Sequence, residues 1–353
     1  MTSLDELLNA ARADVSSGWL PSCQLAVARD GELVAFETFG AATNDTRYCI
    51  FSCTKPIVAA AAWLLIGDGL LDPARRVAEY APEFAANGKD AVTVEQVMLH
   101  TAGFPNAQMK EVDGADAVRR RVTLAKWELE WEPGTRFEYH GTSAHWVLVD
   151  LIERLGGVDF RDFIAQRVCA PLGLPRLLGI PEGDQAGIAP LVHVGEGSLD
   201  APVDAHIGRM NQAEIRAAGV PGYGATMRAA DLALFYQGVM RNPGGLWDPD
   251  VLHDVTTNVR CTFPDNLMQV PVNRTLGLVV AGDDGQHFMR YGSFGVANSP
   301  RSIGHAGAHM QVGWGDPESG ISFAYCTNGI DRDVMKEGAR GVNLSGIAAA
   351  LTA

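Results

Sequence analysis

The chain has 353 residues, of which 47% are hydrophobic and 20% charged, so it is long enough to bury a sizeable core as one large domain or two that share a core. Acidic side chains outnumber basic ones by 42 to 28, which gives a formal net charge of −14 at pH 7. A charge of this sign repels phosphate backbones and anionic membrane surfaces, so nucleic acid and membranes are disfavoured as partners.

The start of the chain and the cysteines favour a reducing compartment. Residues 1–20 contain no basic region followed by an apolar one, so no export signal is visible. The apolar run Ile57–Ile66 is much shorter than the ~20 residues that a membrane span needs. The cysteines lack the paired spacing of a zinc or redox site, so we predict free buried thiols and a cytoplasmic location. They are Cys23, Cys49, Cys53, Cys169, Cys261 and Cys326.

The pattern at the N-terminus predicts a helix followed by an antiparallel hairpin. Apolar residues recur at helical spacing over Leu4–Val15. The strand-like segments Cys23–Ala28 and Leu33–Phe39 then flank Asp30-Gly31, a pair that favours tight hairpin turns.

Helical patterns follow, and then a stretch without a clear period. Apolar periodicity predicts helices at Ile57–Ile66, Val94–Leu99, Ala115–Trp127, Ser143–Leu155 and Phe160–Val168. Asp159 is placed to cap the last of these helices. Prolines and glycines interrupt Asp200–Val220, so we predict a loop wall around a cleft there.

Strand patterns return near the C-terminus. Predicted elements are a helix at Asp231–Met240, strands at Leu276–Val280, Phe288–Tyr291, His309–Trp314 and Ile321–Cys326, and a final helix at Val334–Leu351. Because strands stand at both ends, we predict an α/β fold of the α+β type, in which both chain ends build one mostly antiparallel sheet flanked by helices. An inserted all-α lobe completes it. The predicted domains are 1–75 with 222–353, and 76–221.

Ser52 and Lys55 are the leading candidates for catalytic chemistry. Residues three apart share a helix face, and the residues after Pro56 are almost all apolar, so Lys55 is drawn toward the core. An ammonium group that loses water there has a lowered pKa, and the neutral amine can then accept the proton of Ser52. In the competing structural interpretation, Lys55 reaches back to the surface and Ser52 only caps the helix.

Five segments resemble, in order, the motifs of one known family. They are Ser52-Cys53-Thr54-Lys55, Val92–Gly103, Glu132–Tyr139, Gly222–Leu232 and His305-Ala306-Gly307. Together they make the chain similar to the serine β-lactamase and penicillin-binding superfamily, in its class C-like branch of family VIII-type esterases and D-aminopeptidase-like enzymes. The resemblance implies a serine β-lactamase-like fold and a serine hydrolase that uses no cofactor.

The resemblance also implies roles for individual residues. The catalytic candidates are Ser52, Lys55, Tyr139 and His305. Tyr139, as a phenolate or sharing a proton with Lys55, can relay protons to the leaving group. The backbone N–H groups of Ser52 and Ala308 form the implied oxyanion hole. Gly307 allows an edge strand to approach the substrate closely.

Two departures from the family pattern bear on the substrate. His305 stands where β-lactamases and carboxypeptidases of the family carry lysine, and a largely neutral imidazole suits an uncharged ester; a histidine that only fixes the strand is the alternative. Gly141 stands where the tyrosine motif carries asparagine, and glycine offers no side-chain hydrogen bond. We therefore expect another group, such as His140 or His145, to position Lys55, and ester cleavage rather than amide cleavage.

Histidines and aromatic residues give weaker signals. His100, His140 and His145 lack ligand spacing, so no metal site is predicted. Aromatic residues in segments expected near the cleft favour a wide apolar pocket for an acyl or aromatic group. They are Trp127, Trp131, Tyr223, Trp247, Phe294 and Trp314, of which Trp131, Tyr223 and Trp314 are the substrate-binding candidates together with Gly307.

The sequence thus predicts a cytoplasmic serine hydrolase that cleaves small carboxylic esters through an acyl-enzyme on Ser52. Its partner is a small-molecule ester or amide, and no cofactor is expected. Two alternatives stay open. One is an amidase, D-peptidase, β-lactamase or acyltransferase on the same framework, and the other is a non-catalytic scaffold or binding protein. The oligomeric state has no signature in the sequence.

Overall fold

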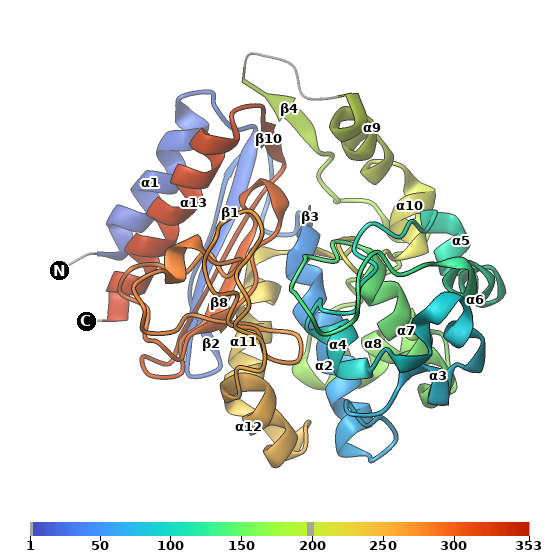
Figure 1. Ribbon diagram of the computed structural model, residues 1–353. Coiled ribbons are helices and arrows are strands. Elements are labelled where there is room, and N and C mark those ends of the chain that lie inside the picture. Colours follow the sequence, from blue (N-terminus) through green and yellow to red (C-terminus); the bar gives the residue numbers. More distant parts are fainter. Residues whose placement is uncertain (1–2, 196–200, 353) are drawn as a thin grey trace.

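The computed structural model describes residues 3–195 and 201–352, and a six-stranded sheet organises it (Figure 1). The strand order is β2-β1-β9-β8-β7-β6, and each neighbouring pair is antiparallel. The strands are β1 Ser22–Arg29, β2 Glu32–Gly40, β6 Val279–Val280, β7 Ile303–Gly304, β8 Val312–Gly315 and β9 Ile321–Thr327. Both ends of the chain therefore build one antiparallel sheet, which confirms the predicted fold class.

Helices cover both faces of this sheet. Helices α1 Leu4–Ser16 and α13 Val334–Ala349 lie side by side on one face, at the left of Figure 1. Helix α11 Ala229–Arg241 packs against β1, β8 and β9 from the other face. Strand β8 shows why two layers form, because Val312 and Trp314 point into the apolar cluster under the terminal helices while glycines alternate with them toward α11.

The mostly helical part of the chain lies on the side of α11, at the right of Figure 1. We call residues 77–218 the helical lobe. Its helices are α3 Val77–Tyr80, α4 Val94–Met98, α5 Glu111–Ala115, α6 Ala117–Lys126, α7 Ser143–Gly156, α8 Phe160–Ile164, α9 Ala201–Met210 and α10 Ala213–Ala218. Helix α2, Thr54–Gly67, is buried along most of its length and packs on α7, so it joins the lobe to the sheet. The predicted boundaries at 75/76 and 221/222 stay a prediction.

The remaining elements are short. Two small sheets pair β3 Tyr48–Cys49 with β5 Thr226–Met227, and β4 Val192–Val194 with β10 Gly329–Asp331. Helix α12 spans Pro249–Thr257. The pairing of β3 with β5 fixes the chain just before Ser52 to the segment just after Gly222.

Local sequence signals were most accurate where turn chemistry was explicit. The hairpin turn at Asp30 and Gly31 is confirmed, with φ of 55° and 86° at these residues. The predicted cap is also confirmed, since the Asp159 side chain accepts a hydrogen bond from Arg161 N at 2.8 Å.

Two predicted elements are wrong. Residues 288–291 form a 3₁₀ turn and irregular chain instead of a strand, and the buried Arg290 side chain donates there to the carbonyls of Pro271 and Ala281. The predicted loop Asp200–Val220 contains α9 and α10, although Asp200 itself lies outside the described residues. Both helices are shorter than the window over which helical periodicity becomes clear.

The cysteines and the helix lengths match the sequence-based expectation. All six cysteines are free and buried. Over residues 3–195 and 201–352, no helix is long and apolar enough to cross a bilayer.

Candidate active site

Ser52 lies in a tight turn that leads directly into α2. The turn is a 3₁₀ helix over Phe51–Cys53, and Phe51 has a φ of 45°, a conformation that side-chain-bearing residues rarely adopt. The turn is held from two sides. Ile50 N donates to Ala225 O at 3.0 Å, and Cys53 Sγ donates to His305 O at 3.0 Å. The serine is therefore fixed at the start of a buried helix.

Lys55 is enclosed by three oxygen atoms. Its side chain is 1% exposed, and Nζ lies 3.2 Å from Ser52 Oγ and 2.7 Å from each of the carbonyl oxygens of Gly141 and Gly222. A neutral amine has two N–H donors and one lone pair. If the two carbonyls accept the donors, the lone pair is left facing the Ser52 hydroxyl, which is the geometry of a general base.

The carbonyl contacts correct the prediction that a histidine positions Lys55. The Nδ1 of His140 lies 2.6 Å from Glu138 O, and its Nε2 accepts from Phe104 N at 3.1 Å, so both ring nitrogens face the backbone. Neither ring nitrogen of His145 makes a hydrogen bond of normal geometry with the described residues, and the hydrogen-bonding group of Lys55 that acts on it is the backbone and not Nζ. Gly141, whose missing side chain raised the question, supplies its own carbonyl instead.

Position 222 has no room for a side chain, because the carbonyl groups that contact Lys55 lie close together there. A Cβ at this position would lie 2.9 Å from Gly141 O and 3.6 Å from Lys55 Nζ. The first distance is too short for a relaxed contact, so a larger residue would push the two carbonyls apart. The glycine-rich segment before α11 therefore shapes the lysine site through its backbone.

The environment of Lys55 favours the neutral amine. Burial is the main cause that lowers the pKa of Lys55 well below its ordinary value, and the nearby charge of Arg274 acts in the same direction. Cys53 opposes them with a smaller effect. The pair Ser52 and Lys55 thus combines a hydroxyl with an amine whose neutral form is favoured by its surroundings.

Tyr139 lies beside this pair. Lys55 Nζ is 4.9 Å from the centre of its ring, and the ring stacks on Tyr291 at 4.7 Å. The hydroxyl is buried and makes no hydrogen bond of normal geometry with the described residues, although Ser52 is near enough to lower its pKa. Burial has the larger effect and raises the pKa of Tyr139, so the neutral hydroxyl fits this site better than the phenolate.

The segment His305–His309 lies directly against the nucleophile turn. A Cβ on Gly307 would lie 2.3 Å from Ile50 O, and the His309 ring meets the Phe51 ring edge-on at 5.3 Å. Ala308 follows Gly307 at the start of a short 3₁₀ turn. The two segments that would supply the oxyanion-hole N–H groups are therefore neighbours, and the pairing of Ser52 N–H with Ala308 N–H stays a prediction.

His305 is fixed within the protein. It is fully buried, and its Nδ1 lies 2.7 Å from Ala306 O, so this nitrogen carries the proton and donates. Nε2 is left as an acceptor, 3.5 Å from Arg274 Nη2. Burial, followed by the charge of Arg274, lowers the pKa of His305 well below its ordinary value. The imidazole is neutral, and each of its ring nitrogens has a neighbour within the protein. This agrees with the alternative of a histidine that fixes the strand.

Most of the aromatic candidates are core residues. Trp314 is wrong as a substrate contact, because strand alternation turns it under α13, where its Nε1 donates to Ser345 Oγ at 2.7 Å. Trp127, Trp247 and Phe294 are also buried in apolar clusters. Trp131 is partly exposed and meets the His140 ring edge-on at 5.9 Å.

Tyr223 borders a cavity next to the lysine carbonyls. The cavity has a volume of about 510 Å³, and Thr142 and Tyr223, which follow Gly141 and Gly222 in the chain, form part of its wall. The Tyr223 hydroxyl donates to Glu111 Oε1 at 3.2 Å, and Arg209 Nε lies 3.3 Å from the same oxygen. Charged and polar side chains line much of this space, so the expected wide apolar pocket is not found here.

Two residues of the site had no signal in the sequence. Arg274 and Tyr291 contact Tyr139 and His305, yet Arg274 lies just before the predicted strand Leu276–Val280 and Tyr291 lies where a strand was wrongly predicted. Only the burial of the Arg274 side chain distinguishes it from a surface arginine. Within the described residues, no group of three or more His, Cys, Asp or Glu side chains is arranged to hold a metal ion.

Comparison with known proteins places these observations in context. The family model described as "Beta-lactamase" matches residues 6–345. "Esterase/beta-lactamase LipL" of Mycobacterium tuberculosis is 27% identical over 316 residues, which cover 80% of this chain and 70% of that protein.

Solved structures resemble the fold closely. A family VIII carboxylesterase superimposes with a TM-score of 0.81 at 24% identity, covering 98% of this chain and 96% of that one. A penicillin-binding protein homolog from Caulobacter crescentus gives a TM-score of 0.79 at 23% identity, with coverages of 98% and 96%.

Proposed function

This chain belongs to the beta-lactamase family, and on that premise we propose that it cleaves small carboxylic esters through an acyl-enzyme on Ser52. The observation that carries this proposal is the contact between Lys55 Nζ and Ser52 Oγ at 3.2 Å, with the other two directions of Nζ occupied by carbonyl oxygens. A buried neutral lysine held in this way has one lone pair that no other group contacts. This lone pair faces the serine hydroxyl, so Lys55 can act as the base.

Acylation begins with a proton transfer from Ser52 Oγ to Lys55 Nζ as Oγ bonds to the ester carbonyl carbon. The N–H groups of Ser52 and Ala308 stabilise the resulting oxyanion. When the bond to the alcohol oxygen breaks, the departing alcohol takes a proton from the Lys55 ammonium through the Tyr139 hydroxyl. The hydroxyl passes one proton on as it receives another, so it stays neutral throughout.

Deacylation repeats the same steps with water. Lys55 is neutral again once the alcohol has left, and it accepts a proton from the attacking water, directly or through Tyr139. The proton then returns to Ser52 Oγ as the acid departs. The charges within the protein are unchanged after each cycle.

Two features of the site favour esters over amides. Position 141 contributes only a backbone carbonyl, which already accepts from Lys55, so the side-chain amide that would bind an amide-bearing acyl group is missing. His305 is neutral and occupied, so the third motif offers no cation for a substrate carboxylate. The esterase part of the name of the relative from Mycobacterium tuberculosis supports ester cleavage.

Active-site labelling tests this proposal. A fluorophosphonate probe should add one label to the wild-type protein and none to Ser52→Ala, and peptide mapping should find the label on Ser52. A label on Cys53 or on another serine would refute the mechanism. Unlabelled wild-type protein would favour a non-catalytic scaffold or binding protein instead.

A second candidate is β-lactam, D-peptide or amide cleavage, or acyl transfer, on the same framework. It is favoured by the beta-lactamase part of the name of the relative from Mycobacterium tuberculosis. Turnover of p-nitrophenyl butyrate and of a chromogenic cephalosporin can be compared directly. Faster cephalosporin turnover would reverse the proposed order.

We further propose a cytoplasmic location. The support is the burial of all six cysteines as free thiols, which is typical of proteins kept in a reducing compartment. Fractionation of the native host would test this assignment.

A further inference from the structure

Arg274 is a buried cation that forms no ion pair with a carboxylate among the described residues, although the charge of the buried Asp265 acts on it from a longer distance. Its side chain is 1% exposed, and no ion pair found in the described part of the chain includes it. Its guanidinium lies over three aromatic rings, with distances to the ring centres of 5.4 Å for Phe137, 5.3 Å for Tyr139 and 5.6 Å for Tyr291. Ring faces attract a cation but do not neutralise it. The charge therefore remains in the interior.

The backbone fixes this guanidinium relative to the nucleophile. Arg274 N donates to Cys261 O at 3.0 Å, and Cys261 N donates back at 3.1 Å. The loop that follows lies tightly on α2, because Trp63 Nε1 donates to Leu276 O at 2.7 Å and a Cβ on Gly277 would lie 2.2 Å from Ala59 Cβ. The helix that carries Lys55 thus also holds the loop that carries Arg274.

Arg274 touches two groups of the proposed site directly. It covers one part of the Tyr139 ring, which also contacts Tyr291, Lys55 and His100. Its Nη2 lies 3.5 Å from His305 Nε2, the only ring nitrogen of His305 that can accept. Loss of Arg274 would therefore remove one contact of the Tyr139 ring and leave the His305 Nε2 lone pair without its neighbouring donor.

A permanent charge at this place disfavours a second one nearby. Arginine stays protonated in proteins, whereas lysine can release its proton when it is buried. A buried cation that has no carboxylate is costly, so its presence beside a buried lysine needs a functional reason.

We propose that Arg274 is a positioning residue of the ester reaction proposed above, on which this inference rests: its fixed charge keeps Lys55 neutral while its guanidinium holds Tyr139 and His305 in place. Arg274 does not touch the reacting atoms. It acts through three other side chains, those of Lys55, Tyr139 and His305.

No other charge around Lys55 can substitute for Arg274. The histidines near the site have pKa values lowered mainly by burial, so they stay neutral, and the thiol and phenol nearby have pKa values raised mainly by burial, so they stay protonated. No Asp or Glu is among the groups found to act on Lys55. The titratable groups around Lys55 are Cys53, His100, Tyr139, His145 and His305, and Cys261, Asp265 and Tyr291 also face Arg274.

Lysine NMR measures the proposed effect without any substrate. The chain has only five lysines, so protein labelled with ¹³C at lysine Cε gives a spectrum in which Lys55 can be assigned by its loss in Lys55→Met. The midpoint of the Lys55 titration is followed in wild type and in three variants: Arg274→Met, Arg274→Gln and Arg274→Lys. Two neutral variants are used so that poor folding of one does not end the test.

The expected midpoint moves to higher pH in both neutral variants and moves less in Arg274→Lys, whose amine supplies the charge only while it is protonated. The midpoint rises because loss of a nearby cation stabilises the ammonium form of Lys55 and so raises its pKa. The acidic limb of the pH profile of kcat/KM for p-nitrophenyl butyrate should move in the same direction, and kcat/KM at pH 7 should fall roughly tenfold or more.

Arg120→Met is the matched control, since it removes another buried arginine that is paired with Asp150 and Glu153. It should lower stability without moving the Lys55 midpoint. An unchanged midpoint in the neutral Arg274 variants would overturn the inference. Absence of Ser52 labelling in the wild type would instead overturn the proposed ester reaction, so the two failures are distinguishable.

Discussion

Two buried arginines show opposite ways of keeping a charge inside this protein. Arg120 in the helical lobe is fully buried, with Nε 3.2 Å from Asp150 Oδ1 and Nη2 3.0 Å from Glu153 Oε2. Arg274 beside the nucleophile is 1% exposed and contacts aromatic rings and a histidine, with no carboxylate in an ion pair among the described residues.

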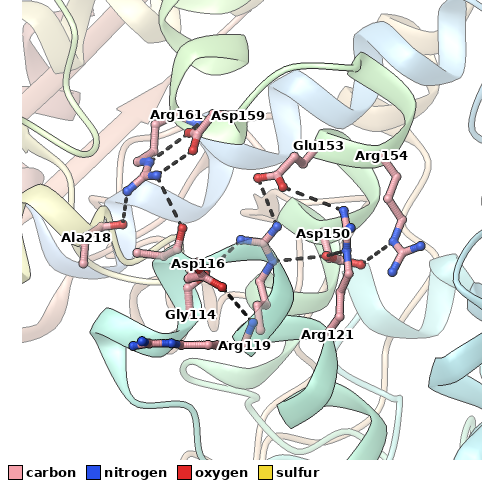
Figure 2. A network of polar contacts seen from close by, with 12 residues as sticks. Gly114, Asp116, Arg119, Arg121, Asp150, Glu153, Arg154, Asp159, Arg161 and Ala218 are labelled. Carbon is pink, nitrogen blue, oxygen red and sulfur yellow. Dashed lines mark hydrogen bonds and ion pairs between the residues drawn. The ribbon is translucent and has the colours of Figure 1, made fainter.

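The two carboxylates that pair with Arg120 also pair with Arg121 and Arg154 (Figure 2). Glu83 pairs with Arg154, so three arginines face three carboxylates in this network. Asp150 also accepts from Arg121 Nε at 3.0 Å and from Arg154 Nε at 2.6 Å, so helices α6 and α7 are joined by several ion pairs. Around Lys55, by contrast, the charge of Arg274 is not paired, and we propose that it disfavours protonation of the lysine. In the lobe, the buried charges form ion pairs that join helices. In the proposed site, Arg274 has no ion pair, which lowers the stability of the fold but favours the neutral form of Lys55.

The largest expected effect that tests this contrast is on activity. Lys55→Met should lower kcat/KM for p-nitrophenyl esters by roughly 10³-fold to 10⁴-fold, because the base that accepts the Ser52 proton is lost. The same variant should keep or raise the melting temperature, since it removes a buried polar group whose charged form is disfavoured. Steady-state kinetics and a thermal melt measure the two effects on one sample.

A loss of stability with retained activity would contradict this assignment of Lys55. It would mean that the contacts of Nζ with Gly141 and Gly222 hold the fold together more than they hold a base.

The next effect is on stability and concerns the lobe. Asp150→Ala leaves Arg120 buried with a missing partner, which should lower the free energy of unfolding by about 3–5 kcal/mol. The activity per folded molecule should be nearly unchanged, because the described contacts of Asp150 are with arginines of the lobe. Urea denaturation and active-site titration with the fluorophosphonate probe measure the two quantities.

Arg241→Ala is the control for Asp150→Ala. It removes an exposed ion pair with Asp30, at 3.3 Å, and should barely change the denaturation midpoint. Equal losses in the two variants would show that burial does not distinguish the lobe network from surface pairs.

The same contrast explains what could be predicted from the sequence. The fold class, the hairpin turn and the helix after Ser52 follow from periodicity and turn chemistry, which are local signals. The closeness of Ser52 and Lys55 follows from helical spacing alone. Each of these statements needs only residues that are near one another in the chain.

The contacts that set the charge of Lys55 are not local. Gly141 and Gly222 reach Nζ through backbone carbonyls, which carry no residue-specific signal, so a histidine was expected in their place. Trp314 was predicted to line the cleft, but its side chain lies on the face of the sheet that α13 covers. Arg274 depends on a loop that packs on α2, and a single arginine at the start of an apolar segment does not reveal this.

The last expected effect is the pH dependence of the stability difference between Lys55→Met and wild type. The pKa of Lys55 is lower in the folded protein than its ordinary value of 10.5, so between the folded and unfolded values the unfolded chain binds the additional proton. Wild-type stability therefore falls as pH decreases from about 10.5, whereas the methionine variant lacks this term. The advantage of Lys55→Met should grow as pH decreases from 10.5 toward 7, a window above the ordinary pKa of 6.5 of the buried histidines His100 and His145. Urea denaturation at intervals across the window measures it, and a difference that stays constant would show that Lys55 is protonated in the folded site, which would remove the base from the proposed mechanism.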